Sequence, residues 1–217
     1  MKYLIDILEN RNFDRLSIDK LKTFTSRDGF NIVVKKDFIE MESVLRGQPV
    51  YENIIPIMTD NNSNYIGLYI DGILKEKVCY LNHEENSLEP KFKSIANLVD
   101  AINANPKYWD LEELPETAFD YPNVNHSDLD NDKIIEGLID EYNSIIDNDI
   151  RIERAFCIMA LTSVDKLENI YHFLDNDDMY IQERAIEIFG FHRCKFAREK
   201  IKELQNTAKH KIGRAHV

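Results

Sequence analysis

A self-similarity of 30 residues in the last third of the chain limits its fold more than any other feature. The matching residues are Glu153, Arg154, Ala155, Ile158, Tyr171 and Leu174 in one copy and Glu183, Arg184, Ala185, Ile188, Ile201 and Leu204 in the next. Each copy has room for two helices. One helix pair cannot bury its own apolar face, so each pair must pack on its neighbour. The repeat therefore predicts an all-α module of stacked helix pairs.

This module, which we assign to residues 128–210, resembles short HEAT-like repeats. Residues that favour helix N-termini precede the expected helices, namely Asp149, Ser163 and the pair Asp177-Asp178. Apolar residues between 134 and 145 predict one more helix in front of the repeat. Two copies are few for a solenoid, and a plain helical bundle is the alternative.

The negative charge of the chain lies in one segment. Residues 110–150 contain 13 acidic residues against one Lys, a net charge of −12 that equals the charge of the whole chain. Residues 109–127 include two prolines and are typical of an acidic linker, a solvated spacer between two modules. The alternative is a negative surface that attracts a basic partner. The residues that would make such contacts are Asp110, Glu112, Glu113 and Glu116.

Composition and charge exclude several classes of protein. Hydrophobic residues make up 43% of the chain, enough for a packed core, and no uncharged stretch approaches the roughly 20 residues that cross a bilayer. With acidic residues close to the N-terminus, we expect a soluble cytoplasmic protein that does not bind membranes. An acidic chain lacks the clustered bases that phosphate contacts need, so we expect no nucleic-acid partner. The basic residues between 193 and 202 are better explained as a solvated helix face.

Residues 1–108 combine helical and strand patterns. Helices are expected at 4–8, 17–24, 37–46 and 92–102, with Ser17 as an N-cap and Gly47 just past a helix end. Strands are expected at 30–34, 54–58, 65–70 and 77–81, and the last two most simply pair antiparallel. The predicted fold class is α+β, a mainly antiparallel sheet flanked by helices and followed by the all-α module.

The order of motifs between residues 50 and 102 resembles the SUKH superfamily. The matching motifs are Ile54-Ile-Pro-Ile-Met58, Thr59-Asp60, Asn64-Tyr65-Ile-Gly-Leu-Tyr69, Asp71-Gly72, Lys77-Val-Cys-Tyr-Leu81, His83-Glu84-Glu85 and Pro90, followed by the helix near Phe92 and Ser94. This family includes fungal regulators of cell-wall synthesis and bacterial immunity proteins that neutralise polymorphic toxins. The resemblance implies a non-enzymatic module that binds a cognate toxin domain. A basic toxin domain would be complementary in charge to the acidic segment. The alternative is a regulatory scaffold that acts through the HEAT-like helices.

Five residues of the expected sheet are candidates for partner contacts: Asp60, Asn64, Tyr65, Tyr69 and Tyr80. The tyrosines alternate with apolar residues, which favours an exposed aromatic face of the kind that anchors protein partners. Packing of the same rings in the core is an equally good interpretation.

An enzyme would have to use His83, Glu84 and Glu85 with Asp60 or Asp71 as metal ligands or as acid and base. Adjacent residues on a strand point to opposite faces, and neither HExxH nor GxSxG spacing occurs. The three Cys lie far apart without CxxC spacing, which predicts neither disulfides nor zinc. We therefore expect no catalytic residues, cofactor or metal.

The terminal residues 211–217 resemble a translated short-read sequencing adapter. We leave them out of the fold prediction.

Overall fold

A computed structural model describes residues 1–83, 87–127 and 129–207. The chain divides into two compact units, Met1–Tyr121 and Pro122–Val217. The first unit combines a sheet with helices and the second is helical, so the chain as a whole is mixed α and β. The expected first domain ended at residue 108, and the structure extends it to Tyr121. The terminal segment 211–217 lies outside the described residues.

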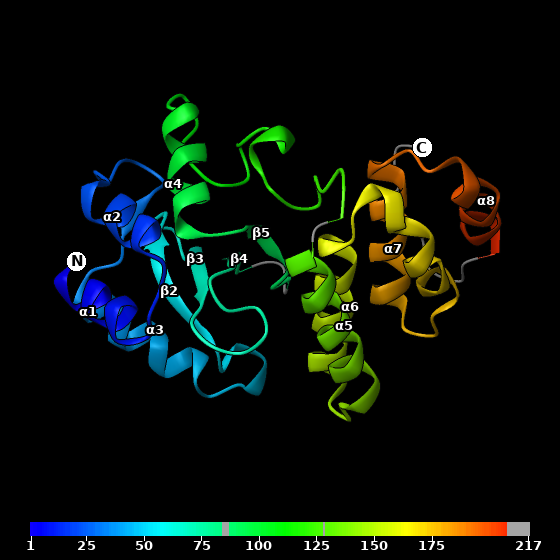
Figure 1. The fold of residues 1–217 in the computed structure, drawn as a ribbon, viewed down its shortest axis with the longest axis horizontal. Helices are drawn as coiled ribbons and strands as arrows, with labels where there is room; N and C mark the ends of the chain where they lie inside the picture. The colour runs from blue at the N-terminus through cyan, green and yellow to red at the C-terminus, as the bar shows by residue number, and fades with distance from the viewer. Residues whose placement is uncertain (84–86, 128, 208–217) are drawn as a thin grey trace. The chain divides into compact units, whose positions relative to one another are not determined.

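The sheet of the first unit is an antiparallel meander of five strands in the order β1-β2-β3-β4-β5. Figure 1 shows its central strands side by side. The strands are β1 (Asn31–Ile32), β2 (Ile54–Thr59), β3 (Tyr65–Tyr69), β4 (Val78–Leu81) and β5 (Pro90–Phe92). The apolar runs thus form antiparallel strands as predicted, with the short β5 in addition.

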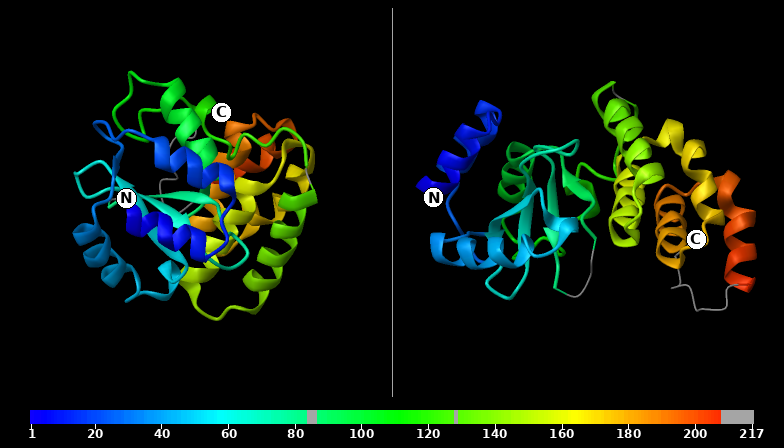
Figure 2. Two further views of the ribbon diagram at one scale, coloured as in Figure 1. Left: turned by 60° about the vertical axis from the view of Figure 1, so that its left-hand side comes forward. Right: turned by 90° about the horizontal axis from the view of Figure 1, so that it is seen from below.

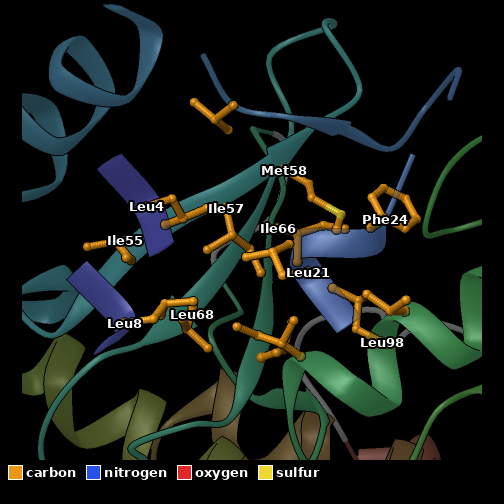
Figure 3. Packing of buried hydrophobic residues seen from close by; sticks show 14 of the residues in the cluster. Leu4, Leu8, Leu21, Phe24, Ile55, Ile57, Met58, Ile66, Leu68 and Leu98 are labelled. Carbon is orange, nitrogen blue, oxygen red and sulfur yellow. The ribbon is translucent and has the colours of Figure 1, made fainter. Parts of the chain in front are cut away.

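Three helices cover one face of this sheet. They are α1 (Lys2–Asn10), α2 (Arg15–Thr23) and α4 (Ile95–Ala104). Figure 3 shows Leu4 and Leu8 of α1, Leu21 of α2 and Leu98 of α4 pointing at residues of β2 and β3. These side chains are fully buried, and burial of each contributes roughly 2 kcal/mol. A fourth helix, α3 (Lys35–Leu45), contacts β2.

Helix caps fix the positions of α2 and α4. The carboxylate of Asp14, not the predicted Ser17, accepts the backbone N–H of residue 17 and caps α2. Ser17 is instead buried inside the helix, where its hydroxyl oxygen accepts the backbone N–H of Ala96 at the start of α4. The Ser94 side chain caps α4 itself. The hydroxyl of Ser17 therefore ties two helices together above the sheet.

The second unit consists of α5 (Leu129–Ser144), α6 (Asn148–Leu161), α7 (Met179–Phe191) and α8 (Arg198–Thr207), with the 3-10 helices η3 (Val164–Asp175) and η4 (Lys195–Ala197). α5 packs on α6, α6 on α7, and α7 on η3, as Figures 1 and 2 show. Within the described part of the chain, no helix is long and apolar enough to cross a membrane.

The two copies of the sequence repeat have equivalent places in this unit. Ala155 of α6 and Ala185 of α7 are both fully buried, and so are Ile158 and Ile188 one turn later. Side chains of Asp147 and Asp178 cap the two helices in the same way. The predicted cap at position 149 is therefore two residues late, because Asp147 already accepts the first backbone N–H groups of α6.

Candidate protein-binding surface

Most of the predicted contact residues meet at one edge of the first unit. Three segments form this edge: the β2–β3 turn, the end of β4 and residues 109–113. The Asn82 side-chain amide donates to Glu112 Oε1 at 2.7 Å, and the hydroxyl of Tyr80 is hydrogen-bonded to the same Glu112 carboxylate. We call this surface the acidic edge and define it by Asp60, Asn64, Tyr65, Tyr80, Trp109, Asp110, Glu112 and Glu113.

The shape of the β2–β3 turn is fixed by hydrogen bonds that join the side chains of Asp60 and Thr59 to the backbone of the turn. Asp60 Oδ1 accepts the backbone N–H groups of Asn62 at 2.7 Å and Asn64 at 3.1 Å. The Thr59 hydroxyl donates to the Asn64 carbonyl oxygen at 3.0 Å. Asn61 has a φ of 63° and Ser63 a φ of 74°, values that Asn tolerates better than most side chains. The run of short polar residues in the sequence therefore specifies a defined turn.

Asn64 connects this turn to the end of β4. Its Nδ2 donates to Asp60 Oδ2 at 2.9 Å, and its Oδ1 accepts the His83 backbone N–H at 3.1 Å. The same Oδ1 lies 2.7 Å from His83 Nδ1. Because a carbonyl oxygen only accepts hydrogen bonds, this contact requires the proton on Nδ1. Asp60, Asn64 and His83 thus form a hydrogen-bonded chain that links the β2–β3 turn to the end of β4.

Two of the three predicted tyrosines lie at this edge, half-buried. Tyr65 and Tyr80 both pack partly against the hydrophobic core. Burial raises the pKa of Tyr80, and the nearby charges of Glu112, Asp60 and Asp110 raise it further. Burial also raises the pKa of Tyr65, with additional effects from the carboxylates of Asp37, Asp60 and Glu40. Their hydroxyls therefore stay protonated donors in a negative environment.

The expected exposed face of three tyrosines is wrong in two respects. Tyr69 is only 4% exposed, and its hydroxyl donates to the Leu88 carbonyl oxygen at 2.9 Å. Tyr80 pairs with Ile66 across the strands, so it lies on the opposite face of the sheet from Tyr65 and Tyr69. The strand period places alternate residues on opposite faces, and the register of β4 against β3 could not be read from the sequence.

The expected acidic linker is folded onto the first unit over residues 109–121. Leu111 and Leu114 are 3% and 4% exposed and belong to the core of the first unit. The Phe119 ring contacts Phe92 with centroids 5.4 Å apart, and the Asp120 carboxylate accepts the backbone N–H of Lys93 at 2.8 Å. The interpretation of residues 109–121 as a solvated spacer is therefore wrong, because their apolar residues pack in the core while Glu112, Glu113 and Glu116 remain exposed.

The four predicted acids of this segment differ in their contacts. Glu112, Glu113 and Glu116 are exposed and Asp110 is half-buried. Asp110 Oδ1 accepts the Glu113 backbone N–H at 2.9 Å, and Glu113 Oε2 accepts the Trp109 backbone N–H at 3.0 Å. Glu116 begins the 3-10 helix η2 (Glu116–Ala118), a few residues beyond the edge.

Sequence reasoning missed Trp109, the only tryptophan of the chain. Its side chain is 64% exposed directly beside Asp110. An exposed tryptophan next to acidic residues is the kind of side chain that dominates protein interfaces. Its place immediately before the acidic run was the available signal.

Of the described residues that an enzyme would need, Asp60 and His83 are joined through Asn64, but Asp71 lies apart from them. Asp71 lies beyond the far end of β3 from Tyr65, where it pairs with Arg11 at 2.9 Å; a hydrogen bond from the Gly72 backbone lowers the pKa of its carboxyl. Cys79 is fully buried. No group of three or more His, Cys, Asp or Glu residues is placed to hold a metal within the described ranges. Glu84 and Glu85 lie outside them.

A surface cavity of about 390 Å³ lies elsewhere on this unit, between α4 and η2. Its polar residues serve internal contacts, since Asp100 pairs with Lys20 of α2 and the Asn97 amide donates to Asp120. We assign no ligand to it.

No protein-family model, no curated protein and no solved structure matches this chain.

Proposed function

We propose that the chain is a protein-binding module, an immunity protein that binds and neutralises a basic toxin domain in the cytoplasm. The first unit would be a SUKH-like domain and the second a HEAT-like helical module. The observation that carries the proposal is the acidic edge, where Asp60, Asp110 and Glu112 gather around Tyr80 and the exposed Trp109 stands next to Asp110. A toxin that acts on nucleic acid has a basic groove, which would be complementary in charge to this edge.

The physical roles of its residues would differ. Exposed carboxylates are screened by water and contribute little affinity individually, but together they raise the rate of encounter with a cation. Affinity would come from aromatic side chains that lose water on binding, with Trp109 first and the partly buried Tyr65 and Tyr80 contributing less. The Asp60–Asn64–His83 chain would keep these groups in place before binding, which lowers the entropic cost.

The gene beside the one for this chain supplies the test. An immunity gene would stand directly downstream of a large secreted toxin gene. The toxin domain encoded there should be lethal when expressed alone and harmless when co-expressed with this chain, and the two should purify as a complex.

Trp109→Ser should weaken this complex by about tenfold or more, because an exposed interface tryptophan is a common hot spot. Leu16→Ser, which changes an equally accessible residue on α2, should leave the affinity unchanged. A neighbouring toxin that neither binds nor is neutralised would contradict the proposal, and equal effects of the two variants would misplace the surface.

A regulatory scaffold is the second candidate. It is favoured by the exposed apolar residues at one end of α6 and α7, which an immunity protein acting through the first unit would not require. A gene without a toxin gene as neighbour would favour this candidate.

A further inference from the structure

The helical unit exposes three large apolar side chains at one place. Ile146, in the loop before α6, is 99% exposed, and Tyr180 in the first turn of α7 is 59% exposed. Met179 next to it is 41% exposed. Single apolar residues on a surface are ordinary, but a group of them marks a contact site.

The two helix ends that carry these residues are neighbours. The side-chain amide of Asn148, the first residue of α6, donates to Asp178 Oδ2 at the start of α7, 3.3 Å away. α6 also packs on α7. Ile146 is two residues from Asn148, and Met179 directly follows Asp178, so the apolar side chains share one end of the helix pair.

This end of the unit is strongly negative. Residues 141–150 and 175–181, at this end, contain six acidic residues, and the neighbouring base is Arg151 in the first turn of α6, whose guanidinium donates to Asn148 Oδ1 at 2.8 Å. Two of these acids are neutralised from other segments, since Asp175 pairs with Lys200 and Glu141 with Arg154. The four acids nearest the apolar group take part in no ion pair within the described part of the chain: Asp147, Asp149, Asp177 and Asp178.

We infer that this end of α6 and α7 is a docking surface for a cationic protein segment that carries a large apolar side chain among its lysines or arginines. The apolar group would bury that side chain, while the four acids would meet the charges around it. A nucleic acid would be repelled by the same acids. The surface lies in a different unit from the acidic edge and needs neither the immunity function nor Trp109.

A labelled lysine–leucine peptide and the full-length chain provide the test by fluorescence anisotropy. The peptide should bind, and the double variant I146S/Y180S should weaken its binding by about tenfold. Val44→Ser, an exposed apolar change on α3, is the matched control and should have no effect. A lysine–serine peptide of equal charge should bind much more weakly than the lysine–leucine peptide.

Three results would overturn the inference: equal binding of the lysine–leucine and lysine–serine peptides, a glutamate–leucine peptide that binds as well, or wild-type affinity in I146S/Y180S. If binding is lost in Trp109→Ser instead, the peptide occupies the acidic edge and the second surface is rejected. That last result would leave the proposed function intact.

Discussion

At the scale of single residues, Gly29 decides whether the acidic segment belongs to the first unit. Its φ is +79°, and a Cβ at this position would lie 1.1 Å from the Trp109 carbonyl oxygen. The backbone of residues 109–110 therefore crosses directly over this glycine. Arg27 supports the crossing from beside it, because its guanidinium donates to the carbonyl oxygens of Tyr108, Ile102 and Asn105.

Gly29→Ala should consequently release residues 109–121 from the core. We expect a loss of more than about 2 kcal/mol in the free energy of unfolding, from backbone strain and the clash together. Proteases should cut the variant within 109–121, a segment that we expect to resist them in the wild type because Leu111 and Leu114 are buried. Gly190→Ala is the control, because its Cβ would meet nothing within 4 Å in helix α7 and should be neutral or stabilising. Equal resistance of Gly29→Ala and wild type would contradict the packing of this segment.

His192 makes the stability of the helical unit depend on pH. Burial lowers the pKa of its ring below the ordinary 6.5, and its Nε2 is buried without a hydrogen-bond partner among the residues that the structure describes. Between that lowered pKa and pH 6.5 the unfolded chain binds more protons than the folded chain. The contribution of the neutral His192 ring to the free energy of unfolding should therefore be fully present above about pH 6.5. It should decrease as the pH falls below that value.

Denaturant unfolding at pH 7.5 and pH 5.5 measures this effect. The wild type should lose more stability between the two values than His192→Gln, which keeps the other histidines and removes this titration. An identical loss in both proteins would show that His192 is not buried as a neutral ring.

At the scale of elements, the two repeat helices depend on equivalent caps. Asp178 Oδ1 accepts the backbone N–H groups of Tyr180 and Ile181, as Asp147 does at the start of α6. Asp147→Ala and Asp178→Ala should each cost about 1 kcal/mol of stability, measured by denaturant unfolding. Asp177→Ala removes an exposed acid one position earlier and should change the stability by less than half as much. An equal loss of stability in Asp177→Ala and Asp178→Ala would show that the negative charge, and not the capping hydrogen bonds, stabilises the helix.

Elements with a strong period could be predicted from the sequence. The strands at 54–58, 65–70 and 77–81 and the repeat helices appear close to their expected positions because apolar spacing alone specifies them. Asp14 was missed as the cap of α2 because Ser17 also has a side chain that can cap a helix. That Ser17 is buried against Ala96 of α4 becomes visible only in the folded structure. Leu111 and Leu114 were overlooked as core residues because two isolated apolar residues among several acids show no helix or strand period.

At the scale of the whole molecule, the acidic residues of the negative segment are divided between the two units. The first unit continues to Tyr121 and therefore includes the first acids of the negative segment. The other acids of the segment belong to the helical unit. The charge excess itself was readable from the sequence. The meeting of Asp60, Tyr80 and Glu112 was not, because it depends on strand register and on the crossing at Gly29. The SUKH-like and HEAT-like assignments and the immunity function stay proposals.

The central claim, that the acidic edge binds a basic protein, is tested most directly by stopped-flow association with the toxin domain encoded beside this gene, at two ionic strengths. The variant D110N/E112Q/E113Q/E116Q keeps the size of the side chains and one acceptor oxygen in each, and removes four charges. Its control, D6N/D19N/E52Q/D100N, removes four exposed charges elsewhere on the first unit. We predict a slower association rate with a flatter salt dependence for the first variant only, and nearly unchanged dissociation. If both variants associate like the wild type with the same salt dependence, the acidic edge does not steer a partner and the account is wrong.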